Sequence, residues 1–259
     1  MMEHDARVWI AALRGAHERL ATFVAGASAD DLVHPSMCAD WNVAQVLSHL
    51  GSGAEIGGAT VTGTPVENAE VWERWNAMDP AGMASSFVSA DERLVGWYEG
   101  LSHDELATLQ VQLPFLPAPI DAAGAAGFRL SEVSLHSWDV FGAFDPAATL
   151  APDAAALLVD RLPMMVRFVG RFTPRETRPA QDTTIRVTTS DPERHYELEL
   201  GDNVDLRQAS GGAAAGELTL PAEALLRLAA GRLAPGREAG ASISGAITLH
   251  QLRAAFPGY

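Results

Sequence analysis

The sequence has no lysine and a single cysteine, and each scarcity excludes a class of protein. All 18 basic residues are arginine, against 33 acidic residues, which gives a formal net charge of −15. Nucleic acids and anionic membranes are bound through basic patches, so this balance argues against both as partners. Cys38 has no second cysteine to pair with, which excludes an intrachain disulfide and favours a reducing compartment.

Long apolar runs are also missing. No stretch approaches the roughly 18 apolar residues that a membrane-spanning helix needs, and the first residues already include Glu3, His4 and Asp5, unlike a secretory signal. We therefore expect a cytoplasmic protein without a membrane segment. With 259 residues, of which 47% are hydrophobic, the chain can bury a full core without disulfides.

The first two-thirds of the sequence is typical of a helical domain. Apolar residues recur at helical spacing over residues 5–25, 43–56, 67–78, 81–101 and 127–144. Asp40 is the expected N-cap of the second of these segments, and Ser102 with Glu105 forms a capping-box signature after the fourth. A further helix is predicted over residues 153–172, where Pro163 should kink or divide it.

The last third alternates polar and apolar side chains, as half-buried strands do. Strands are predicted over residues 183–189, 195–200, 203–207 and 216–220. A helix follows from Pro221 to Ala230, and Gly231 ends it. The sequence therefore predicts an α plus α+β fold, with a helical domain over residues 1–175 and a small α+β domain over residues 176–259.

One helical segment carries two metal-capable side chains on the same face. Glu132 and His136 are four residues apart, so they lie one above the other on a face that is otherwise apolar. Burying an unpaired carboxylate is costly, and a bound divalent cation would satisfy both groups. The alternative is an ordinary side-chain pair at a helix surface, which the spacing alone explains as well.

His49 strengthens the metal interpretation because it lies late in another helix among apolar residues. Helical bundles build metal sites between facing helices, and two histidines with one carboxylate leave a coordination position open, as catalytic zinc sites do. The same set suits non-haem iron, and a structural histidine is the alternative. The neighbouring Trp41 and Trp138 are expected to be core aromatics, and Cys38 a small buried hydrophobe.

These segments resemble a known family. Residues 38–43 read Cys-Ala-Asp-Trp-Asn-Val, with His-Leu at 49–50, and residues 132–139 read Glu-x-x-x-His-x-Trp-Asp. Both are similar to the mycothiol-dependent maleylpyruvate isomerase family. Residues 216–232 look like that family's C-terminal module, which itself resembles sterol carrier domains. The resemblance thus extends over nearly the whole chain.

The resemblance implies both a fold and a ligand set. It implies a DinB-like four-helix bundle whose divalent metal, expected to be Zn²⁺, is held by His49, Glu132 and His136, with mycothiol as thiol cosubstrate. It also implies an arginine of the sterol-carrier-like C-terminal domain that reaches the metal cleft. Arg232 is the nearest match, although a cation at a helix end is an equally good interpretation of that residue. Asp139 is expected to orient a ligand histidine from behind.

A coordinated thiol loses its proton, and the thiolate is the nucleophile. The expected enzyme therefore adds mycothiol to a small electrophilic substrate, either to isomerise a cis double bond or as a thiol S-transferase. It is expected to be a monomer or homodimer. An anionic substrate would need an arginine, for which Arg74, Arg129 and Arg232 are unranked candidates.

Two other functions stay open. In the first alternative, the protein is a hydrophobic-ligand carrier or sensor that binds its ligand in the sterol-carrier-like domain, and its metal is structural. In the second it is a metal-dependent hydrolase, in which the metal activates water. That chemistry requires a general base near the metal, and Asp139, Glu55 and His17 are the candidates.

Overall fold

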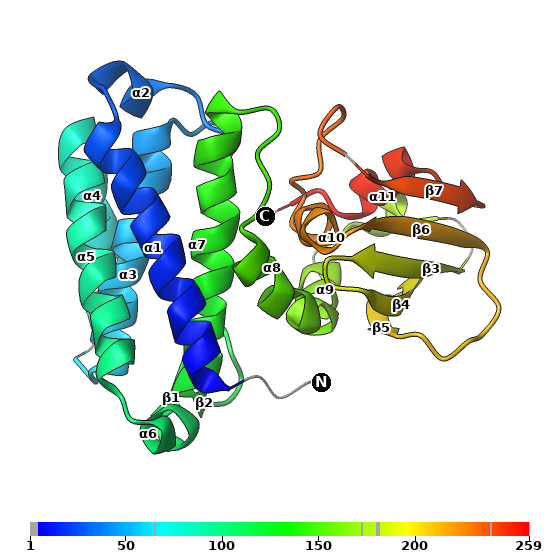
Figure 1. Cartoon of the computed structure of the whole chain (residues 1–259), viewed down its shortest axis with the longest axis horizontal. Helices are drawn as coiled ribbons and strands as arrows, with labels where there is room; N and C mark the ends of the chain where they lie inside the picture. The colour runs from blue at the N-terminus through cyan, green and yellow to red at the C-terminus, as the bar shows by residue number, and fades with distance from the viewer. Residues whose placement is uncertain (1–4, 65, 172, 180–181, 239, 259) are drawn as a thin grey trace. The chain divides into compact units, whose positions relative to one another are not determined.

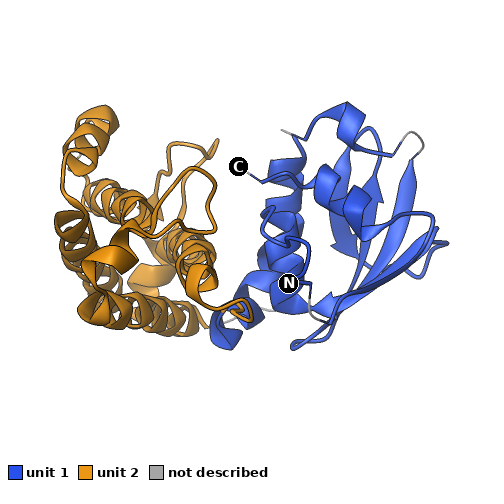
Figure 2. Cartoon of the chain, turned by 90° about the horizontal axis from the view of Figure 1, so that it is seen from above, with its two compact units in different colours: residues 1–2, 151–259 blue, residues 3–150 orange. Residues whose placement is uncertain are grey.

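The structure, a computed structural model, describes residues 5–64, 66–171, 173–179, 182–238 and 240–258. It divides into two compact units, residues 3–150 and residues 151–259 (Figure 2). The predicted fold class, a helical unit followed by a small α+β unit, is confirmed. The division precedes the boundary expected after residue 175, because helices α8 (Pro152–Leu158) and α9 (Leu162–Gly170) contact helix α10 (Ala222–Ala229) of the second unit.

Four long helices frame the first unit (Figure 1): α1 (Ala6–Gly26), α3 (Val43–Val61), α5 (Pro80–Gly100) and α7 (Ala122–Phe144). Helices α1 and α3 each contact both α5 and α7, so the four surround a common core, as in a four-helix bundle. That core contains fully buried side chains from all four helices, among them Leu13, Leu47, Leu50, Phe87 and Leu130. Within the described residues, no helix combines the length and apolarity needed to cross a bilayer.

Short elements connect the long helices. They are α2 (Ala29–Val33), α4 (Asn68–Asn76), α6 (His103–Thr108) and the antiparallel pair β1 (Gln110–Val111) and β2 (Ile120–Asp121). The predicted capping box of Ser102 and Glu105 is present at the start of α6. Helix α4 lies close against α3 because Gly51 leaves room for Trp75. A Cβ atom at Gly51 would lie 2.2 Å from that indole ring.

The second unit is built on a five-stranded sheet in the order β5-β4-β3-β6-β7. Strands β3 (Thr183–Ser190) and β6 (Gly216–Pro221) are parallel, and the other pairs are antiparallel, with β4 (Arg194–Leu200), β5 (Val204–Gln208) and β7 (Ser242–Gly245). The four predicted strands are confirmed. Strand β7 and helix α11 (Leu249–Ala255) were not predicted. Pro163 divides its helix as expected, with a 3-10 turn at Val159–Arg161 before α9.

Candidate metal centre

The start of α3 differs from the prediction in its cap. Asn42, not Asp40, is the N-cap: its side chain accepts a hydrogen bond from the backbone N–H of Gln45, and Oε1 of Gln45 accepts one from the backbone N–H of Asn42. Asp40 instead has a φ of 65° in the preceding turn, a left-handed conformation that aspartate tolerates better than most residues. The reciprocal cap fixes where α3 begins and therefore which way its first turns face.

The loop before α3 is fastened to α7. The backbone N–H of Met37 donates to the carbonyl of Asp139 at 2.9 Å, and the Ser36 hydroxyl donates to the carbonyl of Trp41 at 2.8 Å. These bonds hold the loop against the second half of α7. The Trp41 ring is thereby placed beside the side chains that α3 and α7 contribute to the site.

The three predicted ligands meet between α3 and α7. Nε2 of His49 lies 3.5 Å from Oε2 of Glu132, and the same oxygen lies 3.8 Å from Nε2 of His136. The three candidate ligand atoms all lie within 4.8 Å of one another. Helix α7 contributes two of them through its i, i+4 spacing, and the facing helix contributes the third.

Asp139 stands behind His136. Its Oδ2 atom lies 2.8 Å from Nδ1 of that histidine, and the carboxylate is fully buried. A carboxylate accepts hydrogen bonds only, so Nδ1 carries the proton in the neutral imidazole and the lone pair of Nε2 faces Glu132. This is the tautomer that a metal ligand requires when it coordinates through Nε2.

Trp41 covers one side of the cluster. Its ring centroid lies 5.1 Å from that of His49 and 6.3 Å from that of His136. The expectation of a core aromatic is therefore wrong for Trp41, which is only half-buried. The expectation is confirmed for Trp138, whose ring is buried and whose Nε1 donates to the carbonyl of Ala148 at 2.8 Å.

The site is charged and partly open. Burial alone would raise the pKa of Glu132, but the hydrogen bond from His49 and the attraction of both histidines, which are protonated in the acidic range where this carboxyl titrates, outweigh it and lower the pKa to about 2. The side chains of His49 and Glu132 are nevertheless 40% and 43% exposed to solvent, whereas that of His136 is 10% exposed. A small molecule therefore has access to the cluster from the side of His49 and Glu132.

A second buried network lies next to the cluster. Nε and Nη2 of Arg129, one turn before Glu132 on α7, donate to Asp91 of α5 at 3.1 and 2.6 Å, and Nη2 also donates to the carbonyl of Leu50 at 2.8 Å. Asp91 further pairs with Nδ1 of His17 at 2.9 Å. Burial would raise the pKa of Asp91, yet the charge of Arg129 and the hydrogen bonds from His17 and Arg129 hold it below the ordinary value.

The sequence contained an unused signal for this network. Asp91 follows Ala84 and Phe87 at helical spacing and precedes Leu94, so a charge stands within an apolar stripe. A charge at such a position needs a buried partner. The partner could not be named from the sequence, because it comes from another helix.

The donor set fits a divalent ion. Two imidazole nitrogens and one carboxylate oxygen converge, one histidine is oriented from behind, and solvent reaches the other two ligands. A second group, Cys38 with His136 and Asp139, also has ligand atoms within 4.8 Å. Within this group, Asp139 is already hydrogen-bonded to Nδ1 of His136. Cys38 is half-buried rather than buried as expected.

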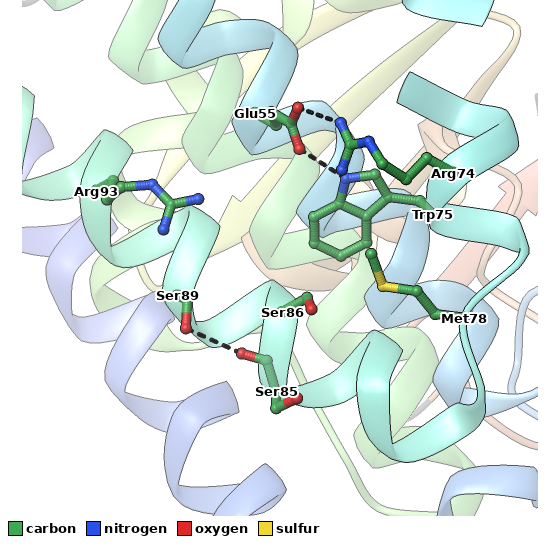
Figure 3. Close-up of a pocket in the computed structure, with 8 residues that line it drawn as sticks. All are labelled: Glu55, Arg74, Trp75, Met78, Ser85, Ser86, Ser89 and Arg93. Atoms are coloured by element: carbon green, nitrogen blue, oxygen red, sulfur yellow. Dashed lines mark hydrogen bonds and ion pairs between the residues drawn. The ribbon is translucent and has the colours of Figure 1, made fainter. Parts of the chain in front are cut away.

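Glu55 and Arg74 belong to another surface. They line a hollow of about 270 Å³ among α3, α4 and α5, which shares no residue with the cluster (Figure 3). Glu55 accepts a hydrogen bond from Nε1 of Trp75 at 2.9 Å and forms a salt bridge with Arg74. Neither the candidate base nor the candidate anion-binding arginine at these positions is part of the cluster.

Arg232 lies in the other unit. It is buried, and its Nη1 donates to the carbonyl of Ala230 at 3.1 Å, just after α10. The three candidate ligands all lie in the helical unit, and the proposed approach of Arg232 to them stays a prediction.

Comparison with known proteins agrees with this architecture. Residues 13–141 match the family model described as the mycothiol maleylpyruvate isomerase N-terminal domain. A crystal structure of the mycothiol-dependent maleylpyruvate isomerase is 15% identical with a TM-score of 0.65, and the match covers 94% of this chain and 95% of that chain. A histidine-to-alanine mutant of that enzyme is 14% identical with a TM-score of 0.66 and the same coverage.

At such identities the likeness to solved structures establishes a shared fold. Among curated proteins, none matches the sequence significantly. The family model rests on the sequence itself and spans the segment from α1 to α7 that contains all three candidate ligands. The chain therefore belongs to the family defined by the mycothiol maleylpyruvate isomerase N-terminal domain.

Proposed function

We propose that this chain is a metal-dependent enzyme that uses mycothiol to attack a small electrophile. The observation that carries the proposal is that three candidate ligand atoms lie within 4.8 Å of one another. All three belong to the helical unit, which contains the residues that the family model matches. The structural likeness to a mycothiol-dependent maleylpyruvate isomerase supports isomerisation of a cis double bond as the reaction. S-transfer is the alternative outcome, because both reactions begin with the same thiol addition.

The metal would supply the activation of the thiol. A divalent ion held by His49, Glu132 and His136, expected to be Zn²⁺, would act as a Lewis acid that lowers the pKa of a thiol. Glu132 is suited to hold it, because a pKa of about 2 keeps this carboxylate ionised at neutral pH. Asp139 keeps His136 in the tautomer that presents Nε2 to the site.

One side of the ligand cluster is covered by an aromatic ring, and the other side is open to small molecules. The Trp41 ring lies beside both histidines, where its apolar face would limit the approach of water from that side. The exposed edges of His49 and Glu132 leave the other side for the thiol and the electrophile. Hydrolysis is less well supported, because the candidate bases Asp139, Glu55 and His17 already bond to His136, to Trp75 and to Asp91, respectively.

Cobalt substitution tests the first step. Cobalt-loaded protein should develop a thiolate-to-metal absorbance band when mycothiol is added, and so should the control His195→Ala, whose histidine is an exposed residue of β4 paired with Glu193. His49→Ala and His136→Ala should show no band. A wild-type protein that binds cobalt stoichiometrically yet shows no band with mycothiol would contradict the proposal.

The two reactions are separated by the fate of the thiol. With maleylpyruvate as the probe, proton NMR should show conversion of the cis to the trans isomer while the amount of free mycothiol stays constant. Consumption of mycothiol with formation of a stable thioether would identify an S-transferase instead.

A further inference from the structure

Arg129 has hydrogen-bond donors that the bundle does not use. Its Nε and Nη2 atoms bond to Asp91 and to the carbonyl of Leu50, whereas Nη1 forms no hydrogen bond with any residue that the structure describes. Some polar side-chain atoms of the described chain are fully buried and lack a hydrogen-bond partner, but Nη1 is not one of them. It therefore keeps access to solvent, with two N–H groups available to a ligand.

These donors lie beside the candidate metal centre. On α7, Arg129 precedes Glu132 by one turn. On α3, Gly53 follows His49 by one turn, and a Cβ atom at Gly53 would lie 3.4 Å from Nη1 of Arg129. Residues three or four apart share a helix face, so Nη1 and the ligand cluster lie along the same seam between α3 and α7. The charge of Arg129 also contributes to the low pKa of Glu132.

We propose that Nη1 of Arg129 binds a carboxylate of the electrophilic substrate while the substrate reacts at the neighbouring metal centre. This role rests on the proposed function. Asp91 and the Leu50 carbonyl hold the guanidinium plane in place, so the group loses little freedom when a ligand binds. A planar guanidinium matches a carboxylate better than an ammonium group does.

The structure ranks Arg129 above Arg74 and leaves Arg232 unranked. Arg74 faces the hollow of Figure 3 and is paired with Glu55. Arg232 lies in the other unit and donates to a carbonyl of its own segment. Arg129 alone of the three belongs to the helix that contributes two ligands. A purely structural role in pairing Asp91 would use Nε and Nη2 but would leave Nη1 without a purpose.

Calorimetric titration of zinc-loaded protein with maleate tests this role. Arg129→Lys keeps a positive charge opposite Asp91 but has no atom at the position of Nη1. It should weaken maleate binding at least about tenfold, the loss expected for one charge-assisted hydrogen bond. Arg74→Lys is the matched control and should bind as the wild type does, and uncharged dimethyl maleate should not distinguish the variants. A folded Arg129→Lys that binds maleate with wild-type affinity would overturn the proposal.

A glycine pair gives a second test that leaves the ion pair intact. Gly53→Ala places a methyl group against Nη1, its only neighbour within 4 Å, whereas Gly58→Ala on the same helix meets nothing within that distance. Both substitutions favour helix formation. Gly53→Ala should weaken maleate binding relative to Gly58→Ala, and equal affinities would show that the ligand does not occupy the space at Nη1.

Failure of the proposed function can be told apart from failure of this inference. If the protein binds no divalent metal even when it is supplied, the thiol-activating centre is contradicted. The same maleate titrations on metal-free protein then still test whether Arg129 binds a carboxylate, because Asp91 and Leu50, and not a metal, hold its guanidinium group.

Discussion

Oδ2 of Asp139 lies 2.8 Å from Nδ1 of His136, and no part of the aspartate side chain reaches solvent. The backbone of Asp139 is held as well, because its carbonyl accepts the N–H of Met37. One residue therefore fixes both the tautomer of a candidate ligand and the loop that brings Trp41 to the site. The arrangement of the proposed metal centre depends on this relationship as much as on the three ligands.

Asp139→Asn should weaken zinc binding by about 10- to 100-fold, the range found when a carboxylate behind a metal-bound histidine is removed. The amide can still accept a hydrogen bond from Nδ1, but it lacks the charge that makes the imidazole a stronger ligand. Zinc affinity measured by chelator competition checks this. Asp30→Asn, an exposed position on α2, is the control, and equal affinities in both variants would show that Asp139 does not support a metal ligand.

Asp91→Asn should lower the free energy of unfolding by about 3 kcal/mol or more, because it leaves Arg129 buried without its charged partner. Glu99→Gln provides the surface comparison. Glu99 is also on α5 and pairs with Arg14 of α1, but 41% of its side chain is exposed, so that change should cost less than about 1 kcal/mol. Denaturant unfolding at pH 7 measures both, and equal losses would contradict the buried role of Asp91.

The destabilisation by Asp91→Asn should also depend on pH. The pKa of Asp91 is lowered in the folded protein from an ordinary value of 3.8. Its contribution to stability is therefore fully present above that value and is lost as the pH falls through the lower folded-state pKa. The difference in unfolding free energy between wild type and Asp91→Asn should be constant near neutral pH and shrink below about pH 4. A difference that grows on acidification would have the wrong sign.

Gly51→Ala should destabilise the helical unit by about 1–3 kcal/mol, because the added methyl group would overlap the ring of Trp75 at 2.2 Å. Gly58→Ala on the same helix has open space and should stabilise it by about 0.5–1 kcal/mol. Thermal unfolding of the two variants compares them directly. Two alanines that stabilise to the same extent would show that α4 does not pack on α3 through Trp75.

Local patterns predicted most of the elements but missed one helix cap and one strand of the five-stranded sheet. Helical periodicity located α3 and α7, and alternation located strands β3 to β6. Aspartate is a strong N-cap residue, so the sequence predicts Asp40 as the cap of α3, but Asn42 with Gln45 offers a reciprocal pair of bonds. Strand β7 was not predicted, since its short, exposed segment pairs with β6 over only four residues.

The candidate ligands and Asp139 behind them were predictable from the sequence, whereas the neighbouring network of Arg129 and Asp91 was not. The i, i+4 spacing of Glu132 and His136 is a property of one helix and can be read directly. The pairing of Arg129 with Asp91 joins two helices, so periodicity could place each charge on a buried face but could not join them. The same limit left Arg74 and Arg129 unranked until the helices were assembled.

Metal content of four variants tests the central claim most directly. Protein purified without chelators should contain nearly one divalent ion per chain in the wild type and in His195→Ala, by elemental analysis. His49→Ala, Glu132→Gln and His136→Ala should have lost most of it while remaining folded. Retention of the metal in all three ligand variants, or a folded wild-type protein that binds no divalent metal even when it is supplied, would contradict the account.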